Sequence, residues 1–132
     1  MSLEHTASQA IDAASASLRA LSLDIHAHPE QAYAEVHAHQ ALTEWLAEAG
    51  FAVTPSAYGM ETAFEATRGE GGPTIAVLSE YDALPGIGHA CGHNLIAISG
   101  VAAGLAVAEA LEREGIEGTV RVLGSPAAGR SA

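Results

Sequence analysis

The sequence predicts an α/β fold in which helices pack against a mixed sheet. Two segments before residue 50 have apolar residues at spacings of three and four, which is typical of amphipathic helices. Two later segments alternate between apolar and polar residues, as half-buried strands do. A short apolar run, a long apolar segment and a last short run follow, and this order is typical of a βαβ unit. The predicted order is therefore α-α-β-β-β-α-β.

The first two predicted elements are amphipathic helices. In the first, "TASQ" at 6–9 fits a capping box, and Pro29 marks the end because the residue before a proline is pushed out of the helical region. The second runs from about Gln31 to Ala49 and is followed by Gly50, the residue type that most readily ends a helix. The apolar stripes consist of Ile11, Ala14, Leu18, Leu21 and Ile25 in the first helix and Val36, Leu42, Trp45, Leu46 and Ala49 in the second.

The remaining elements are predicted to form the sheet and its crossover. "FAVTPSAY" at 51–58 and "TAFEATRG" at 62–69 alternate and read as paired strands. "TIAVLS" at 74–79 is a continuous apolar run, which suits a strand buried on both faces. The segment 94–114 is predicted to be a helix that is apolar nearly all round. Its small residues would let the backbone of a neighbouring element approach closely, so the helix should be central and buried. With a last strand at 118–124, this unit should form a right-handed crossover.

Composition restricts the expected partners and location. The chain has 132 residues, which fits one domain, and its formal charge of −11 without any lysine would repel phosphate backbones. The N-terminus has neither the basic nor the apolar region of a secretory signal, and the longest uncharged apolar run, 95–108, is too short for a bilayer. We therefore expect a cytoplasmic protein with no nucleic-acid and no membrane partner. The single cysteine excludes an internal disulfide.

Chemistry-bearing side chains are concentrated in one loop, "EYDALPGIGHACGH", which contains Glu80, Asp82, His89, Cys91 and His93. The loop follows a predicted strand of the βαβ unit, and ligands in such sheets bind beyond the carboxyl ends of the strands. A thiolate and an imidazole two residues apart can both bind zinc or a similar divalent ion. The two carboxylates could add an oxygen ligand or orient an imidazole.

Two other interpretations of this loop stay open from its residues alone. Cys91 could be a nucleophile activated by a histidine, although such pairs normally join residues distant in sequence. It could also be a small buried hydrophobic residue among ordinary loop histidines. A chelator should impair function only if the loop is a metal site, whereas alkylation of the thiol should abolish the activity of a nucleophile.

The other histidines lie in "HAHPE" at 26–30 and "HAHQ" at 37–40. Residues i and i+2 of a helix point about 200° apart, so the two histidines of one motif cannot share an ion. His37 and His39 are therefore predicted to be surface positions. His26 and His28 flank a helix end, where a cation is favourable.

Several segments together resemble a known family. "HAHPEQAYAEVHAHQALTEWLAEAGF", "TAFEATRG", "TIAVLSEYDALPGIGHACGHNLIA" and "GTVRVLGSPA" occur in the order found in the N-terminal part of the aminoacylase and carboxypeptidase superfamily of di-metal peptidases. The branch that it most resembles contains aminobenzoyl-glutamate hydrolase, bacterial amidohydrolases and a mammalian dipeptidase. The resemblance covers residues 20–127.

The resemblance implies a zinc-peptidase-like three-layer sandwich, interrupted in the family by a lid or dimerisation domain. It also implies two divalent ions, zinc or manganese, and a glutamate general base acting on an N-acyl amino acid or a dipeptide. Cys91 and His93 match two metal ligands of the family, and Asp82 matches the acid that orients a ligand. Glu80 stands where other branches have a histidine ligand. Glu80 and His89 are therefore possible further ligands, in addition to Cys91 and His93.

The sequence departs from the family after the last strand. Where the family has Pro-Ala-Glu-Glu, this chain has "PAAG", so Ala128 and Gly129 occupy the positions of the general base and of a further ligand. The expectation is a single incomplete catalytic-type domain, 1–132, truncated and without the lid. Such a chain would hold metal weakly and would be inactive alone. The alternative is a non-catalytic module that oligomerises or binds metal weakly; in either case uncovered strand edges predict a homo-oligomer.

Overall fold

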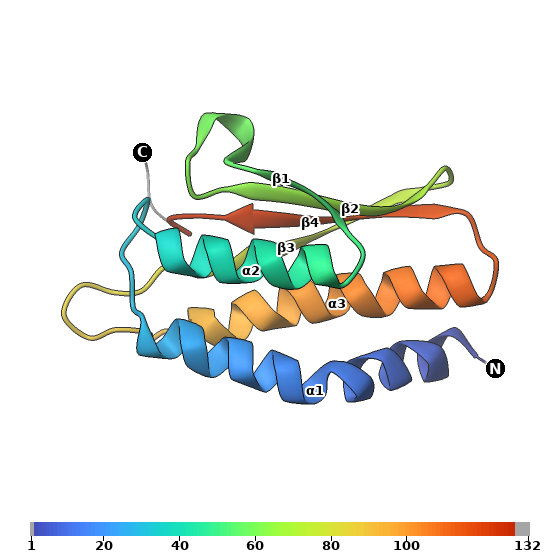
Figure 1. Ribbon diagram of the computed structural model, residues 1–132, viewed down its shortest axis with the longest axis horizontal. Helices are drawn as coiled ribbons and strands as arrows, with labels where there is room; N and C mark the ends of the chain where they lie inside the picture. The colour runs from blue at the N-terminus through green and yellow to red at the C-terminus, as the bar shows by residue number, and fades with distance from the viewer. Residues whose placement is uncertain (1, 129–132) are drawn as a thin grey trace.

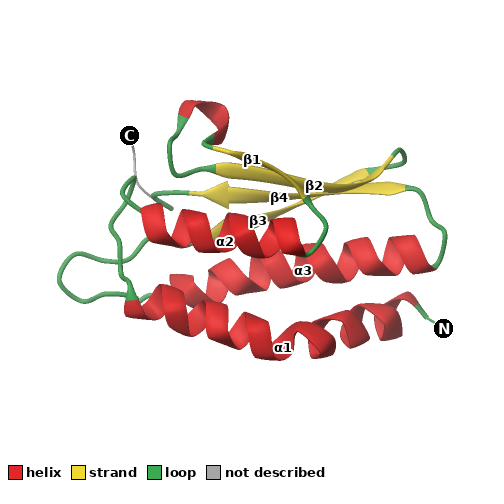
Figure 2. Ribbon diagram, in the orientation of Figure 1, coloured by secondary structure: helices red, strands yellow, loops and turns green. Residues whose placement is uncertain are grey.

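The computed structural model describes residues 2–128, which form three helices on one side of a four-stranded sheet (Figures 1 and 2). The elements are α1 (Leu3–Ala27), α2 (Val36–Glu48), β1 (Ala52–Pro55), a 3₁₀ turn η1 (Ala57–Gly59), β2 (Phe64–Glu70), β3 (Thr74–Glu80), α3 (His93–Arg113) and β4 (Gly118–Ser125). Apart from the short η1, this is the predicted order α-α-β-β-β-α-β.

The sheet is mixed and has the strand order β1-β2-β4-β3. β1 pairs with β2 and β2 with β4 in antiparallel register, whereas β4 pairs with β3 in parallel. The parallel pair is joined through α3, so the predicted βαβ crossover is confirmed. β4 is a central strand, and its alternate residues Val120 and Val122 are fully buried beneath the helices.

α3 is the central helix of the fold. It lies between the sheet and α1, while α2 covers β1 and β2 (Figure 1). A β-carbon added at Gly100 would lie 2.3 Å from the carbonyl oxygen of Leu78, so the predicted close backbone approach is confirmed. The uncharged run 95–108 is short, but the whole of α3 is long and apolar enough to cross a membrane by length and composition. Half of its most apolar stretch is buried in the fold, as in a core helix.

The prediction that the strand at 74–79 is buried on both faces is wrong. β3 is an edge strand, and one of its faces packs on α3 through Val77 and Ser79. On the other face the side chain of Leu78 is 55% exposed, because no helix formed by residues 2–128 covers that face of the sheet. A continuous apolar run does not distinguish these two positions, since burial of the second face depends on what covers it.

The first helix starts earlier than the predicted capping box. Ser2 is the N-cap, and its hydroxyl accepts a hydrogen bond from the backbone N–H of His5 at 3.1 Å. Thr6 is buried inside the helix and caps nothing. The stripe is correct from Ala14 onward, but Ile11 is exposed because the buried face of the first turns passes through Thr6 and Ala10 instead.

The second helix starts at Val36 and not at Gln31. The carboxylate of Glu30 accepts hydrogen bonds from the backbone N–H groups of His37 and Ala38, at 2.8 and 2.9 Å. This side chain therefore caps the helix from outside, and the residues between lie in a turn. Val36, at the first position of α2, is exposed and does not belong to the buried stripe.

Candidate metal centre

The loop that joins β3 to α3 lies at the carboxyl ends of the two parallel strands. The last residue of β3, Glu80, is paired with Ser125 at the end of β4. The loop is held in place by a hydrogen bond from the N–H of Ala83 to the carbonyl oxygen of Glu30, at 2.7 Å. Buried Tyr81 anchors its start by donating a hydrogen bond to the carbonyl oxygen of Thr62. The chemistry-bearing residues therefore lie where the topology predicts a site.

His93 and Asp82 form the central contact of this region. His93 is the first residue of α3, and its Nδ1 lies 2.9 Å from Oδ1 of Asp82, whose side chain is only 3% exposed. When Nδ1–H donates to this carboxylate, Nε2 carries the lone pair and can bind a metal. Asp82 also accepts the backbone N–H of Ala128 at 3.1 Å. Asp82 thus contacts the imidazole that, by the resemblance, it is expected to orient.

Glu80 lies on the other side of the His93 ring. Its Oε2 is 3.8 Å from Nε2, the nitrogen that Asp82 leaves free. Two ligand atoms bound tetrahedrally to one zinc ion are about 3.4 Å apart, since each bond is about 2.1 Å long. The separation is close to this value, so Glu80 is placed where an oxygen ligand could join His93.

His89 is a buried histidine without a hydrogen-bonding partner among the described residues. The residue is 8% exposed, and neither ring nitrogen makes a hydrogen bond of normal geometry, although the backbone of Ile25 lies close to the ring. Burial lowers the pKa of His89 below its ordinary value, and the neighbouring His26 and His93 lower it further. Both ring nitrogens are thus buried without a hydrogen bond of normal geometry to residues 2–128. A metal, a water molecule or a ligand would supply the missing partner.

Cys91 is exposed at the surface of the loop. In the described part of the chain, its sulfur does not lie in a compact group of three ligand atoms with His93 and a carboxylate. Within residues 2–128, one such compact group of ligand atoms occurs, and it consists of Asp24, His28 and His37, away from this loop. The residues of the loop are thus brought to one end of the sheet, but Cys91 and His93 do not by themselves close a site.

Glu35 is a residue at this end of the fold that no sequence motif singles out. Its side chain is fully buried, and its carboxylate accepts hydrogen bonds from the hydroxyl of Thr62 at 3.0 Å and from the N–H of Ala127 at 2.8 Å. The segment after β4 is therefore fixed from two sides, by Glu35 and by Asp82. Ala128, one of the two positions where the family has glutamate, lies within this segment; Gly129 lies outside the described residues.

Comparison with known proteins places these features in one class. No family model matches the chain. It is 44% identical to the Xaa-Arg dipeptidase of Mus musculus over 95% of this chain and 32% of that protein. It is also 40% identical to a p-aminobenzoyl-glutamate hydrolase protein of Escherichia coli, over 75% of this chain and 24% of the relative. The chain spans about a third or less of the length of these curated relatives.

Solved structures agree with these relatives. A dinuclear metal-binding peptidase of the M20 family from Bacillus subtilis matches with a TM-score of 0.74 and 30% identity, over 88% of this chain and 36% of the other. A putative aminohydrolase from methicillin-resistant Staphylococcus aureus has the same fold, with a TM-score of 0.72, 22% identity, and coverage of 90% and 35%.

The fold and the relatives define the class of metal-dependent peptidases and amidohydrolases, of which this chain matches about a third of the length or less. Within that class the chain belongs to the M20 family of peptidases, over about a third of their length. The family resemblance stated from the sequence motifs is thereby confirmed.

Proposed function

We propose that the chain supplies metal-binding residues of a metal-dependent amidohydrolase or peptidase. The observation that carries this proposal is the contact between His93 and buried Asp82, beside the unpartnered ring of His89. Cys91 and His93 would hold a divalent ion, zinc or manganese, and Glu80 and His89 are the possible additional ligands. The donor set of thiolate, imidazole and carboxylate suits zinc.

The residues of the loop would prepare the site in distinct ways. A bound divalent ion would polarise an amide carbonyl and lower the pKa of a water molecule. Asp82 would keep the proton of His93 on Nδ1, so that Nε2 would offer its lone pair to the ion. Since the relatives include a dipeptidase and the N-acetylcysteine deacetylase of Bacillus subtilis, we propose an N-acyl amino acid or a dipeptide as the substrate class.

We also propose that this chain does not catalyse hydrolysis alone. Ala128 and Gly129 occupy the positions where the family has its general base and another ligand, and a methyl group cannot accept a proton. Loss of a general base typically costs about 10²- to 10⁴-fold in rate. Ala128 therefore also favours the alternative role, a non-catalytic module that binds metal weakly or oligomerises.

Metal held at this loop should be weakly bound. After dialysis, elemental analysis should find most of the zinc or manganese lost from the wild-type protein, and Cys91→Ala should remove the share that the loop retains. Asp82→Asn should weaken binding by about 10- to 100-fold, because the orienting contact to His93 is lost. The exposed Asp12→Asn is the matched control. Stoichiometric, chelator-resistant metal that depends on Cys91 would contradict weak binding.

An assay of amide hydrolysis separates the two roles. The substrates are an N-acyl amino acid and a dipeptide, with zinc or manganese added, and the chain is assayed alone and mixed with a full-length homologous peptidase. We expect no turnover by the chain alone. Turnover by the chain alone would contradict the proposed inactivity, whereas activity above that of the homologue itself would indicate that another chain completes the site.

The exposed sheet surface leads us to propose a homo-oligomer, most simply a two-fold dimer. Within residues 2–128, no strand pairs with the outer edge of β3, and Leu78 is exposed on the face that it shares with its cross-strand partner Leu123. Sedimentation at micromolar concentration should show a dimer, and Leu78→Lys should shift it towards monomer. Leu23→Lys, at an equally exposed leucine of α1, should not. A compact wild-type monomer with a cooperative melt would contradict the proposal.

A further inference from the structure

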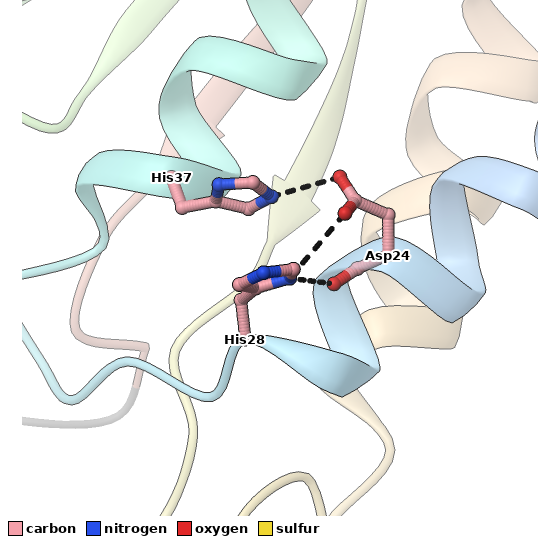
Figure 3. Close-up of side chains that lie close together, drawn as sticks. All are labelled: Asp24, His28 and His37. Carbon is pink, nitrogen blue, oxygen red and sulfur yellow. Dashed lines mark hydrogen bonds and ion pairs between the residues drawn. The ribbon is translucent and has the colours of Figure 1, made fainter.

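The two histidine-rich motifs meet at the junction of α1 and α2. Asp24 lies in the last turn of α1, His28 is the residue that caps the end of this helix, and His37 lies in the first turn of α2. One ligand atom from each residue lies within 4.8 Å of the other two. Figure 3 shows the two imidazole rings next to the Asp24 carboxylate. The sequence excludes a shared ion within either motif, but the turn between the helices brings one histidine from each motif to the same carboxylate.

The carboxylate of Asp24 lies between the two imidazole rings. Its Oδ2 is 2.8 Å from Nε2 of His37, and its Oδ1 is 3.3 Å from Nδ1 of His28. The two rings are stacked with their centroids 4.0 Å apart and an interplanar angle of 22°. Three nitrogen and oxygen ligands from two helices thus face one small volume (Figure 3).

We propose that Asp24, His28 and His37 form a second metal site, which binds a divalent transition metal such as zinc independently of the loop 80–93. Two imidazoles and one carboxylate are a ligand set that zinc uses in proteins, with a water molecule in the fourth position. Around one ion the ligand atoms would move to about 3.4 Å apart, given bonds of about 2.1 Å. The side chains are 40–53% exposed, so they are free to make this adjustment and the ion can enter from solvent.

The electrostatic surroundings favour a cation at this position. The carbonyl groups at the end of α1 give that end a partial negative charge. The opposing positive end of α2 is already neutralised by Glu30, whose carboxylate accepts the N–H groups of His37 and Ala38. The formal charge of the whole chain, −11, acts in the same direction.

One contact opposes metal binding. Nδ1 of His28 also lies 2.8 Å from the backbone carbonyl oxygen of Asp24, to which it can donate its proton. An ion bound at Nδ1 replaces that hydrogen bond, and the ring proton then has to lie on Nε2. Without metal, the same residues form an Asp24 carboxylate bonded to two imidazoles, which is the alternative that the experiment has to exclude.

The experiment uses the full chain with Cys91→Ala and His93→Ala, which removes the two main ligands proposed for the loop. Zinc chloride is titrated into this protein in a calorimeter at slightly alkaline pH. We expect about one equivalent to bind and the melting temperature to rise with zinc, because the ion binds only the folded state. Cobalt should give the visible absorption of a nitrogen- and oxygen-ligated ion.

Three variants in the same background identify the ligands. His28→Gln, His37→Gln and Asp24→Asn should each weaken zinc binding at least about 10-fold and remove the rise in melting temperature. His5→Gln, the same substitution at an exposed position of α1, should leave both unchanged. Circular dichroism verifies that each variant is folded. The proposal is overturned if no equivalent binds, or if the His28 and His37 variants bind zinc as the control does.

Discussion

Replacement of Glu35 with alanine should lower the free energy of unfolding by about 3 to 5 kcal/mol, because two buried donors lose their acceptor and a cavity remains. The hydroxyl of Thr62 and the N–H of Ala127 both donate to this carboxylate, which is fully buried. Urea denaturation followed by circular dichroism measures the change. The effect should be accompanied by partial loss of order after β4, since the N–H of Ala127 makes one of the two hydrogen bonds that fix this segment.

Two further substitutions test the cause of that loss. Glu35→Gln keeps the shape but offers one acceptor oxygen, and its amide N–H₂ would face the second donor, so it should recover only part of the stability. Glu61→Ala, at an exposed glutamate near the same end, should change the free energy of unfolding by at most about 0.5 kcal/mol. If Glu35→Ala were as mild as this control, the buried carboxylate would not hold the two segments together.

Gly100→Ala should destabilise the protein by about 2 to 3 kcal/mol, as overpacking against a fixed neighbour does. The added methyl group would lie 2.3 Å from the carbonyl oxygen of Leu78 and 3.1 Å from the Cα of Ser79, so α3 would have to move away from β3. In an exposed helix, replacement of glycine with alanine stabilises the protein by about 1 kcal/mol. A destabilising effect would therefore show that the close contact between α3 and β3 is present. Thermal and urea unfolding measure it.

The neighbouring Ser99→Ala is the matched control for Gly100→Ala. Ser99 is exposed on α3, so its replacement should leave the free energy of unfolding nearly unchanged or slightly higher. A Gly100→Ala protein as stable as the wild type would mean that α3 and β3 can separate at little cost. In that case the orientation of His93, the first residue of α3, would not depend on this contact.

The order of the elements was predictable because each signal is local. Periodicity identifies a helix or a strand, and a strand–helix–strand order identifies the crossover. The edge position of β3 was not predictable, because the strand order β1-β2-β4-β3 is a property of the whole sheet. The start of α2 was predicted too early, at Gln31, because the cap is the side chain of Glu30, which lies outside the helix and whose role depends on the fold of the turn.

The candidate site was predictable where its residues lie close in sequence. The loop 80–93 could be recognised from its residue types and its position after a strand, and the placement of His93 beside Asp82 agrees with that expectation. Glu35 could not be recognised, since an isolated glutamate carries no signal until burial and its donors are known. The Asp24 cluster was not predicted because helical spacing compares histidines within each motif, whereas the contact joins the two motifs across a turn.

The short connection between α1 and α2 makes hydrogen bonds with three other segments: the start of α2, the loop after β3 and the segment after β4. Glu30 caps α2 with its carboxylate and accepts the N–H of Ala83 with its carbonyl oxygen, while Glu35 accepts the N–H of Ala127. In hydrogen exchange, this connection and the loops after β3 and β4 should therefore open together as one cooperative unit. Surface loops usually tolerate insertions. An extra residue between Glu30 and Glu35 would displace one carboxylate relative to the other, so the length of this exposed segment is as constrained as the register of a core strand.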